Sequence, residues 1–402
     1  MYLTAAIVPQ GGLFRGREYR DVGLYGDYAR ALLDGRMPYR DFFVEYPPGA
    51  FAVFTPPALL PDDAYRHAFK VLMALLGVGI LIVAALILVR LGAGRRRLYG
   101  TLTALALAPL ALGPVSLNTY DAWPALLVGG AVCALLYGRP TLGFGLLGLA
   151  VTAKLYPVAL LPLFCLAARP RLRQPLLVFG AVVAVAFAPF AVLGWDGLWE
   201  SFRAQAGRGL QLESLGGAFL LAADRLGLYD ASVVGSSTAA LSRDLAGSVP
   251  DALAVASSLL QVAAILAVAM VFVLRRGGIG ERLVAAAAAT LVGFLAFSRF
   301  ISPQYLVWLL PLIPITGVAA TALLAAAMVL GQLWFFHYRD VFDLEGIGWL
   351  VVLRDAVLVA LYGLLLWRTM TPSSSRTFDQ APLSRRRASG TAAVEADERR
   401  SR

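Results

Sequence analysis

The chain has 402 residues, of which 59% are hydrophobic and only 15% charged, and its formal net charge is +10. Soluble domains carry about 25% charged residues, so this composition excludes a soluble protein and indicates an integral membrane protein. The positive charge stands in short arginine clusters between apolar runs, as membrane topology requires, and therefore does not indicate binding to nucleic acid.

Residues 1–66 are predicted to form an N-terminal stub and a first outer loop. Met1–Pro9 is apolar, but it is too short to cross a bilayer and lacks the basic start of a signal peptide. We therefore expect that the true start lies upstream and that a first membrane helix is missing before Gly11. The stretch 21–48 then gathers carboxylates beside aromatic residues and ends in a Tyr-Pro-Pro sequence.

The rest of the chain up to residue 368 predicts an all-α polytopic membrane protein with about 11 helices, or 12 if a first helix is missing. The region 141–168 is too long for one straight crossing and short for two, so a hairpin of short or broken helices is expected there. Two membrane parts, 67–193 and 251–368, flank an outer loop at 194–250, and a disordered cytoplasmic tail is predicted at 369–402. The apolar runs are 67–90, 98–116, 122–138, 141–154, 156–168, 174–193, 252–274, 283–298, 305–318, 319–336 and 349–367.

Arginine placement predicts the orientation of the chain in a plasma membrane. Clusters at 90–97, 169–173 and 275–282, together with Arg368, follow apolar runs and are assigned to the cytoplasm by the positive-inside rule. Alternating crossings then place the acidic and mixed segments on the outer face, so the functional surface is expected there. These outer segments are 11–66, 117–121, 194–250, 299–304 and 337–348.

Asp21 is the first candidate for chemistry. A carboxylate held near the bilayer surface and partly desolvated can act as a general base toward a hydroxyl group, although spacing alone favours a solvated loop aspartate. Asp27 is its nearest competitor. The consecutive prolines after Tyr46 fit a rigid elbow and a plain loop-to-helix junction equally well. An elbow would hold Glu45 and Tyr46 near the membrane interface.

Lys154 stands between apolar runs and is followed by Pro157. A lysine at membrane depth is costly, so it suggests a function such as pairing with a lipid-linked phosphate. The alternative is a lysine that extends from a helix end to the membrane surface.

Two further outer segments carry polar candidates. Arg208 and Arg299 could bind a phosphate, and Glu213 and Gln304 could bind sugar hydroxyls, although an Arg–Glu structural pair also fits. Asp121 lies at an outer turn, and turn chemistry alone explains an aspartate there. The cysteines lie inside apolar runs, and no metal-ligand spacing is present, so no cofactor is expected and no ligand cluster requires a divalent cation.

Six short motifs follow one another along the chain: DVGLY at 21–25, G-x-x-P-Y at 35–39, YPP at 46–48, AKLYP at 153–157, RGLQLES at 208–214 and SPQYLVWLLPL at 302–312. Together they resemble the bacterial GT-C membrane glycosyltransferases of glycosyltransferase family 87, which are polyprenol-phosphate-mannose-dependent mannosyltransferases. The resemblance implies a GT-C bundle of roughly a dozen helices. Family members usually begin with a full membrane helix before the catalytic aspartate, and this chain departs from that pattern.

The resemblance also implies an activity. The donor would be a sugar on polyprenyl phosphate, with mannose favoured over arabinofuranose or another sugar, and the acceptor would be a glycolipid or lipid-linked glycan on the outer face. Asp21 would be the catalytic base of an inverting transfer. Charge and outer placement suggest Lys154, Arg208 and Arg299 as phosphate ligands. The acceptor and sugar candidates are Asp27, Glu45, Tyr46, Glu213 and Gln304.

Two other classes of protein are also polytopic. A transporter or flippase of lipid-linked sugars would place charges and broken helices near the membrane midplane, often in two repeated halves. Here the carboxylates lie in outer loops and no repeat is evident, which favours an enzyme. A polytopic scaffold without chemistry would not concentrate its polar residues on one face.

Overall fold

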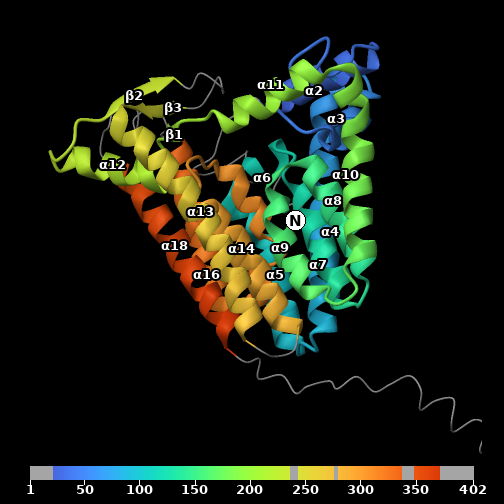
Figure 1. Ribbon diagram of the computed structural model, residues 1–402, viewed down its shortest axis with the longest axis vertical. Helices are drawn as coiled ribbons and strands as arrows, with labels where there is room; N and C mark the ends of the chain where they lie inside the picture. The colour runs from blue at the N-terminus through green and yellow to red at the C-terminus, as the bar shows by residue number, and fades with distance from the viewer. Residues whose placement is uncertain (1–20, 236–242, 276–278, 337–347, 372–402) are drawn as a thin grey trace, which may run out of the picture. The chain divides into compact units, whose positions relative to one another are not determined.

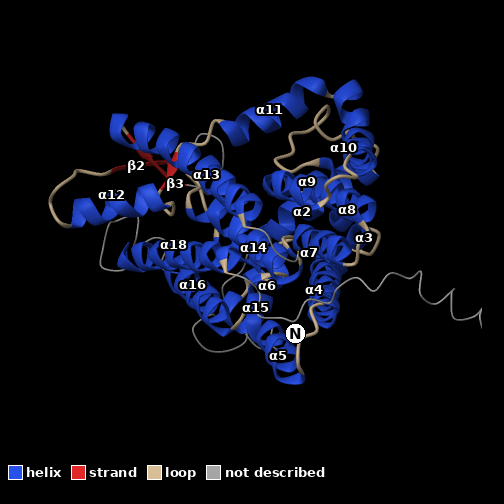
Figure 2. Cartoon of the chain, turned by 60° about the horizontal axis from the view of Figure 1, so that its bottom comes forward, coloured by secondary structure: helices blue, strands red, loops and turns tan. Residues whose placement is uncertain are grey.

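The computed structural model describes residues 21–235, 243–275, 279–336 and 348–371 (Figure 1). These residues belong to one compact unit that ends at Thr371. Helices make up nearly all of it, and the strands gather in one small sheet beside α12 and α13 (Figure 2). The prediction of an all-α polytopic membrane protein is confirmed.

Five helices within the described ranges are long and apolar enough to cross a membrane, and each coincides with a predicted apolar run. One of them, α10, exposes apolar side chains such as Leu177, Val185 and Val192, which suits a lipid-facing helix. Its other side packs on α8. The five helices are α4 (Tyr65–Arg90), α10 (Arg173–Leu193), α13 (Ser248–Leu274), α16 (Val318–Phe336) and α18 (Gly348–Met370).

Shorter helices complete the bundle. The predicted hairpin at 141–168 is confirmed as broken: α8 ends at Ala153, Lys154 has an extended backbone, and a 3-10 helix over Tyr156–Leu160 leads into α9. The run 305–318 is broken too, because it forms the 3-10 helix Pro303–Leu309 and then α15. The short helices are α5 (Arg95–Leu112), α6 (Val115–Asn118), α7 (Ala122–Leu136), α8 (Pro140–Ala153), α9 (Leu161–Ala167), α14 (Gly280–Ala296) and α15 (Ile313–Thr316).

The arginine clusters meet at one end of the bundle. Arg90, at the end of α4, donates to the carbonyl of Leu136 at the end of α7 over 2.9 Å. Arg97, near the start of α5, pairs with Glu281 in the first turn of α14, and Arg368, near the end of α18, donates to the carbonyl of residue 316. We call this end the arginine end. The contacts explain why charges between apolar runs are retained where several helix termini come together.

The other end of the bundle, here called the cavity end, holds the polar segments. Figure 1 shows α2, α11 and the small sheet together at this end, and both views show α11 running from the end of α10 toward the sheet. The sheet is antiparallel with the order β1-β3-β2. The elements are α2 (Asp21–Leu33), α3 (Phe51–Ala58), α11 (Trp195–Ala206), β1 (Leu210–Gln211), α12 (Leu215–Arg225), β2 (Ser232–Gly235) and β3 (Arg243–Ala246).

Two expectations fall on residues that the structure does not describe. The missing first helix concerns the chain before Gly11, and nearly all of the predicted disordered tail lies beyond Thr371. The described part adds one detail at this boundary: α18 continues through Met370, so the segment predicted as disordered from residue 369 begins as helix.

Candidate active site

A cavity of about 550 Å³ lies at the cavity end, between α2, the junction after α8, α11, β1 and the 3-10 helix Pro303–Leu309. The predicted site residues come from segments far apart in sequence, and the fold brings most of them to this one space. Seven of the nine line it: Asp21, Glu45, Tyr46, Lys154, Arg208, Glu213 and Gln304.

Asp21 begins α2 and is half-buried at the cavity wall. Burial raises the pKa of its carboxyl to about 6; the nearby Asp121 carboxylate adds to the rise, and the Lys154 ammonium offsets part of it. The side chain is therefore ionised at neutral pH yet more basic than an ordinary aspartate. That combination suits a general base that must take a proton from an alcohol.

Aromatic packing holds α2 in place behind Asp21. The ring of Tyr25, one turn along the helix, stacks on Phe54 of α3 with centroids 4.4 Å apart and planes 7° from parallel. The same ring meets the edges of Tyr46 and Tyr120 at 5.6 Å and 5.5 Å. These contacts tie the helix to three other segments and fix where its first residue lies.

The predicted proline elbow is present after Tyr46. Pro48 begins a 3-10 helix that continues directly into α3. A Cβ at Gly49 would come within 2.7 Å of the backbone of Thr152, so only glycine lets the elbow pack so closely on the end of α8. The elbow thus supports Glu45 and Tyr46 on one side and the segment carrying Lys154 on the other.

Lys154 forms a buried ion pair with Asp121 across 2.5 Å. The Asp121 side chain has no exposed surface, whereas 13% of the Lys154 side chain is exposed, at the cavity. The ammonium also faces the rings of Tyr120, Tyr305 and Trp308 at 4.8, 5.0 and 5.1 Å. Sequence reasoning explained Asp121 by turn chemistry alone and missed this role; the signal for it was the buried lysine itself, which needs a carboxylate partner.

Arg208 follows α11 and lines the same cavity. Its guanidinium lies 4.9 Å from the ring of Phe300. Its Nε is buried and has no hydrogen-bond partner among the described residues. Burial raises the pKa of the neighbouring Glu45, and the charge of Arg208 offsets part of that rise. A guanidinium with a buried unpaired N–H beside a cavity is suited to an incoming anion.

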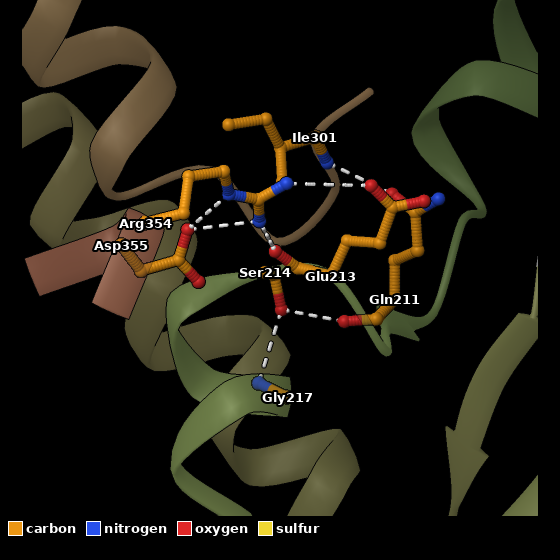
Figure 3. A network of polar contacts seen from close by, with 7 residues as sticks. All are labelled: Gln211, Glu213, Ser214, Gly217, Ile301, Arg354 and Asp355. Atoms are coloured by element: carbon orange, nitrogen blue, oxygen red, sulfur yellow. Dashed lines mark hydrogen bonds and ion pairs between the residues drawn. The ribbon is translucent and has the colours of Figure 1, made fainter. Parts of the chain in front are cut away.

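Glu213 lines the cavity but faces a second cluster of charges behind the wall (Figure 3). Its partner is Arg354 of α18, with 3.4 Å between guanidinium and carboxylate, and not Arg208. Arg354 also holds Asp355 at 2.8 Å. One guanidinium thus serves two buried carboxylates, and burial raises the pKa of Glu213 to about 8, offset in part by Arg354.

The residues around Glu213 fasten the segment after α11 to the rest of the bundle (Figure 3). The side-chain oxygen of Gln211 accepts from the backbone N–H of Ile301 over 2.8 Å. The hydroxyl of Ser214 accepts from the N–H of Gly217 and so caps the start of α12. The motif at 208–214 therefore has a largely structural role: its hydrogen bonds hold the segment in place so that Arg208 and Glu213 line the cavity.

Two predicted site residues lie outside the cavity lining. Asp27 is exposed on α2 and pairs with Arg30 at 3.2 Å. Arg299 donates to the carbonyl of Ala206 over 2.5 Å and braces the end of α11. Within the described ranges, no three side chains of histidine, cysteine, aspartate or glutamate gather in a way that could hold a metal ion.

The model of one protein family, glycosyltransferase family 87, matches residues 43–303, which is more than half of the chain. The chain belongs to glycosyltransferase family 87. The matched part of this family 87 glycosyltransferase carries Glu45, Lys154, Arg208 and Glu213, whereas Asp21 precedes it. No curated protein matches the chain. Family membership and the five apolar helices together show a membrane glycosyltransferase, and the cavity is its candidate active site.

Proposed function

We propose that this enzyme is a GT-C transferase that moves a sugar, with mannose favoured, from a polyprenyl-phosphate donor to a lipid-linked or cell-envelope glycan. The observation that carries the proposal is the half-buried carboxylate of Asp21 on the wall of a cavity that also presents Lys154 and Arg208. A base and two cations around one space are what an alcohol attack with a phosphate leaving group requires.

The proposed reaction is a single inverting displacement. The acceptor oxygen bonds to the anomeric carbon while the bond from that carbon to the phosphate oxygen breaks. The hydroxyl proton passes to the carboxylate of Asp21, and polyprenyl phosphate leaves with the bonding electrons. Arg208 and Lys154 stabilise the charge that develops on the phosphate.

Arg208 is the stronger of the two proposed phosphate ligands. Its buried Nε has no partner among the described residues, whereas Lys154 already pairs with Asp121. Arg299 takes no part in this proposal, since it lies outside the cavity lining and its guanidinium contacts a backbone carbonyl. Glu45, Tyr46 and Gln304 line the same space and are proposed to contact the acceptor or the sugar ring.

The proposed reaction takes place at the outer face of the plasma membrane. The arginine contacts Arg90–Leu136 and Arg97–Glu281 lie at the end of the bundle away from the cavity. The positive-inside rule assigns such an end to the cytoplasm. The cavity then opens on the side where lipid-linked sugar donors and envelope glycans would meet.

The test is a transfer assay with purified enzyme in lipid vesicles and a series of radiolabelled polyprenyl-phosphate sugars. We expect one donor to yield a labelled, newly glycosidically linked lipid or glycan. Label that crosses the vesicle membrane while remaining on its polyprenyl phosphate would instead show a transporter. Absence of any transfer with every donor and envelope-lipid acceptor would overturn the proposal.

A further inference from the structure

Asp121 is the most deeply buried charged group beside the cavity, and the proposed reaction does not use it. Its side chain has no exposed surface, so it cannot meet a substrate. One oxygen, Oδ1, accepts from Lys154 Nζ and from Trp308 Nε1, each over 2.5 Å. The other oxygen, Oδ2, is buried and has no hydrogen-bond partner among the described residues.

The geometry around Asp121 directs its charge onto Lys154. The ring of Trp308 is held flat against Tyr156, with centroids 3.8 Å apart and planes 1° from parallel. Tyr305 also stacks on the Trp308 ring, with centroids 4.3 Å apart. The carboxylate and the aromatic rings surround the ammonium, and the Lys154 side chain, which stays 13% exposed, lines the cavity.

We infer that Asp121 is a positioning residue, which holds the ammonium of Lys154 at the cavity wall where the phosphate of the donor binds. The inference rests on the proposed function and names how one of its two phosphate ligands is kept in place. Without Asp121, a lysine of four rotatable carbons would lose its fixed position, and a buried cation would lose its counter-charge.

The same pair sets the electrostatic environment of Asp21. The groups that face Asp21 are Asp121, Lys154, Glu45 and the hydroxyl of Tyr25. Asp121 itself faces Lys154, Asp21 and the hydroxyl-bearing rings of Tyr120 and Tyr156. The carboxylate of Asp121 raises the pKa of Asp21 and the ammonium of Lys154 lowers it. Neutralising one partner must therefore move the titration of Asp21 in the opposite direction from neutralising the other.

The experiment compares Asp121→Asn, Lys154→Met and the double variant, with Asp34→Asn as a matched control on an exposed residue just after α2. Two quantities are measured: the acidic limb of the kcat/KM profile, and the affinity for farnesyl phosphate, a soluble short polyprenyl phosphate. We expect Asp121→Asn to move the limb to lower pH and Lys154→Met to move it to higher pH, each by about 0.5 to 1 unit. Both single variants should bind farnesyl phosphate about 10-fold more weakly, and the control should match the wild type.

The double variant tests whether Asp121 acts through Lys154. It buries no unpaired charge, so it remains measurable if Asp121→Asn fails to fold, and its affinity should equal that of Lys154→Met. A further loss in the double variant, or wild-type affinity in Asp121→Asn or Lys154→Met, would overturn the inference. So would a wild type that does not bind farnesyl phosphate. If the wild type binds this phosphate but transfers no sugar, the proposed function fails while the binding measurements still decide the role of the pair.

Discussion

Two buried charge clusters flank the same cavity, and they are built differently. On one wall, Lys154 pairs with one carboxylate, that of Asp121, and still presents part of its side chain to the cavity. On the other wall, Arg354 serves both Glu213 and Asp355, and only 1% of its side chain is exposed. The first pair leaves its cation available to a ligand. In the second cluster, the guanidinium is fully engaged by the two acidic side chains and holds segments of the chain together.

This difference indicates that one charge cluster serves catalysis and the other serves the stability of the fold. The Lys154–Asp121 pair lies beside Asp21 and changes its pKa. The Arg354 cluster joins Glu213, just after β1, to α18, one of the five long apolar helices (Figure 3). Substitutions on the first wall should therefore change catalysis, and substitutions on the second should change stability.

The largest effect is expected from Asp21→Asn. The amide keeps the shape of the side chain but cannot take a proton, so transfer should fall by about 10² to 10⁴-fold, the range for loss of a general base. The thermal midpoint of the purified protein should stay within about 2 °C, since the group is only half-buried at the start of a helix. Turnover rates near those of the wild type would remove Asp21 from the mechanism.

On the second wall, Arg354→Met should lower the stability of the protein, whereas Asp21→Asn lowers its activity. Removing this guanidinium leaves the buried Asp355 carboxylate without a counter-charge and the buried Glu213 side chain without its hydrogen-bond donor, and we expect a loss of about 3 to 5 kcal/mol in stability. Thermal unfolding in detergent, followed by circular dichroism, measures it. The matched variant Glu213→Gln should cost less than about 1 kcal/mol, because the raised pKa of Glu213 means that the native side chain is largely protonated. Equal losses in both variants would show that the native Glu213 side chain is ionised and depends on the charge of Arg354.

The comparison also shows what the sequence could reveal. Apolar runs predicted the helices well, including the broken region around Lys154, because bilayer length and proline chemistry act locally. Seven of the nine site candidates line one cavity because charges between apolar runs are costly and collect where water or a ligand can reach them.

Pairings across the chain could not be predicted in the same way. Glu213 and Arg354 are separated by 141 positions, and no local spacing indicates that they meet. Asp27 and Asp21 stand six residues apart on one helix, and only the packing of α2 decides that Asp21 lines the cavity while Asp27 is exposed. Asp121 looked like a turn residue because its partner lies beyond the next two helices.

A smaller effect on activity is expected from Arg208→Gln, which tests whether Arg208 binds the phosphate of the donor. Loss of one charge-assisted contact to phosphate should raise KM for the donor and weaken farnesyl phosphate binding by about 10 to 100-fold. Arg203→Gln, on the preceding turns of α11 and outside the cavity lining, is the matched control. Equal binding by the two variants would place the donor phosphate elsewhere.

The pH response separates the two walls by sign. Asp21 must be ionised to act as a base, so kcat/KM should fall tenfold per unit below its pKa of about 6. Glu213 has a folded-state pKa of about 8, above its ordinary value of 4.5, so it binds its proton more tightly when folded. Its contribution to stability is therefore fully present below pH 4.5 and is lost as the pH rises through about 8.

At pH 5 the enzyme should thus be about tenfold less active than at pH 7. The contribution of Glu213 to folding stability should be no smaller at pH 5 than at pH 7. The check is to measure transfer and the thermal midpoint at both values, and then to return the acid sample to pH 7. Full recovery of activity is expected, because protonation of the base is reversible. Glu213→Gln should flatten the rise of stability toward acid without moving the acidic limb of activity, whereas a shift of that limb would mean that the two clusters act as one.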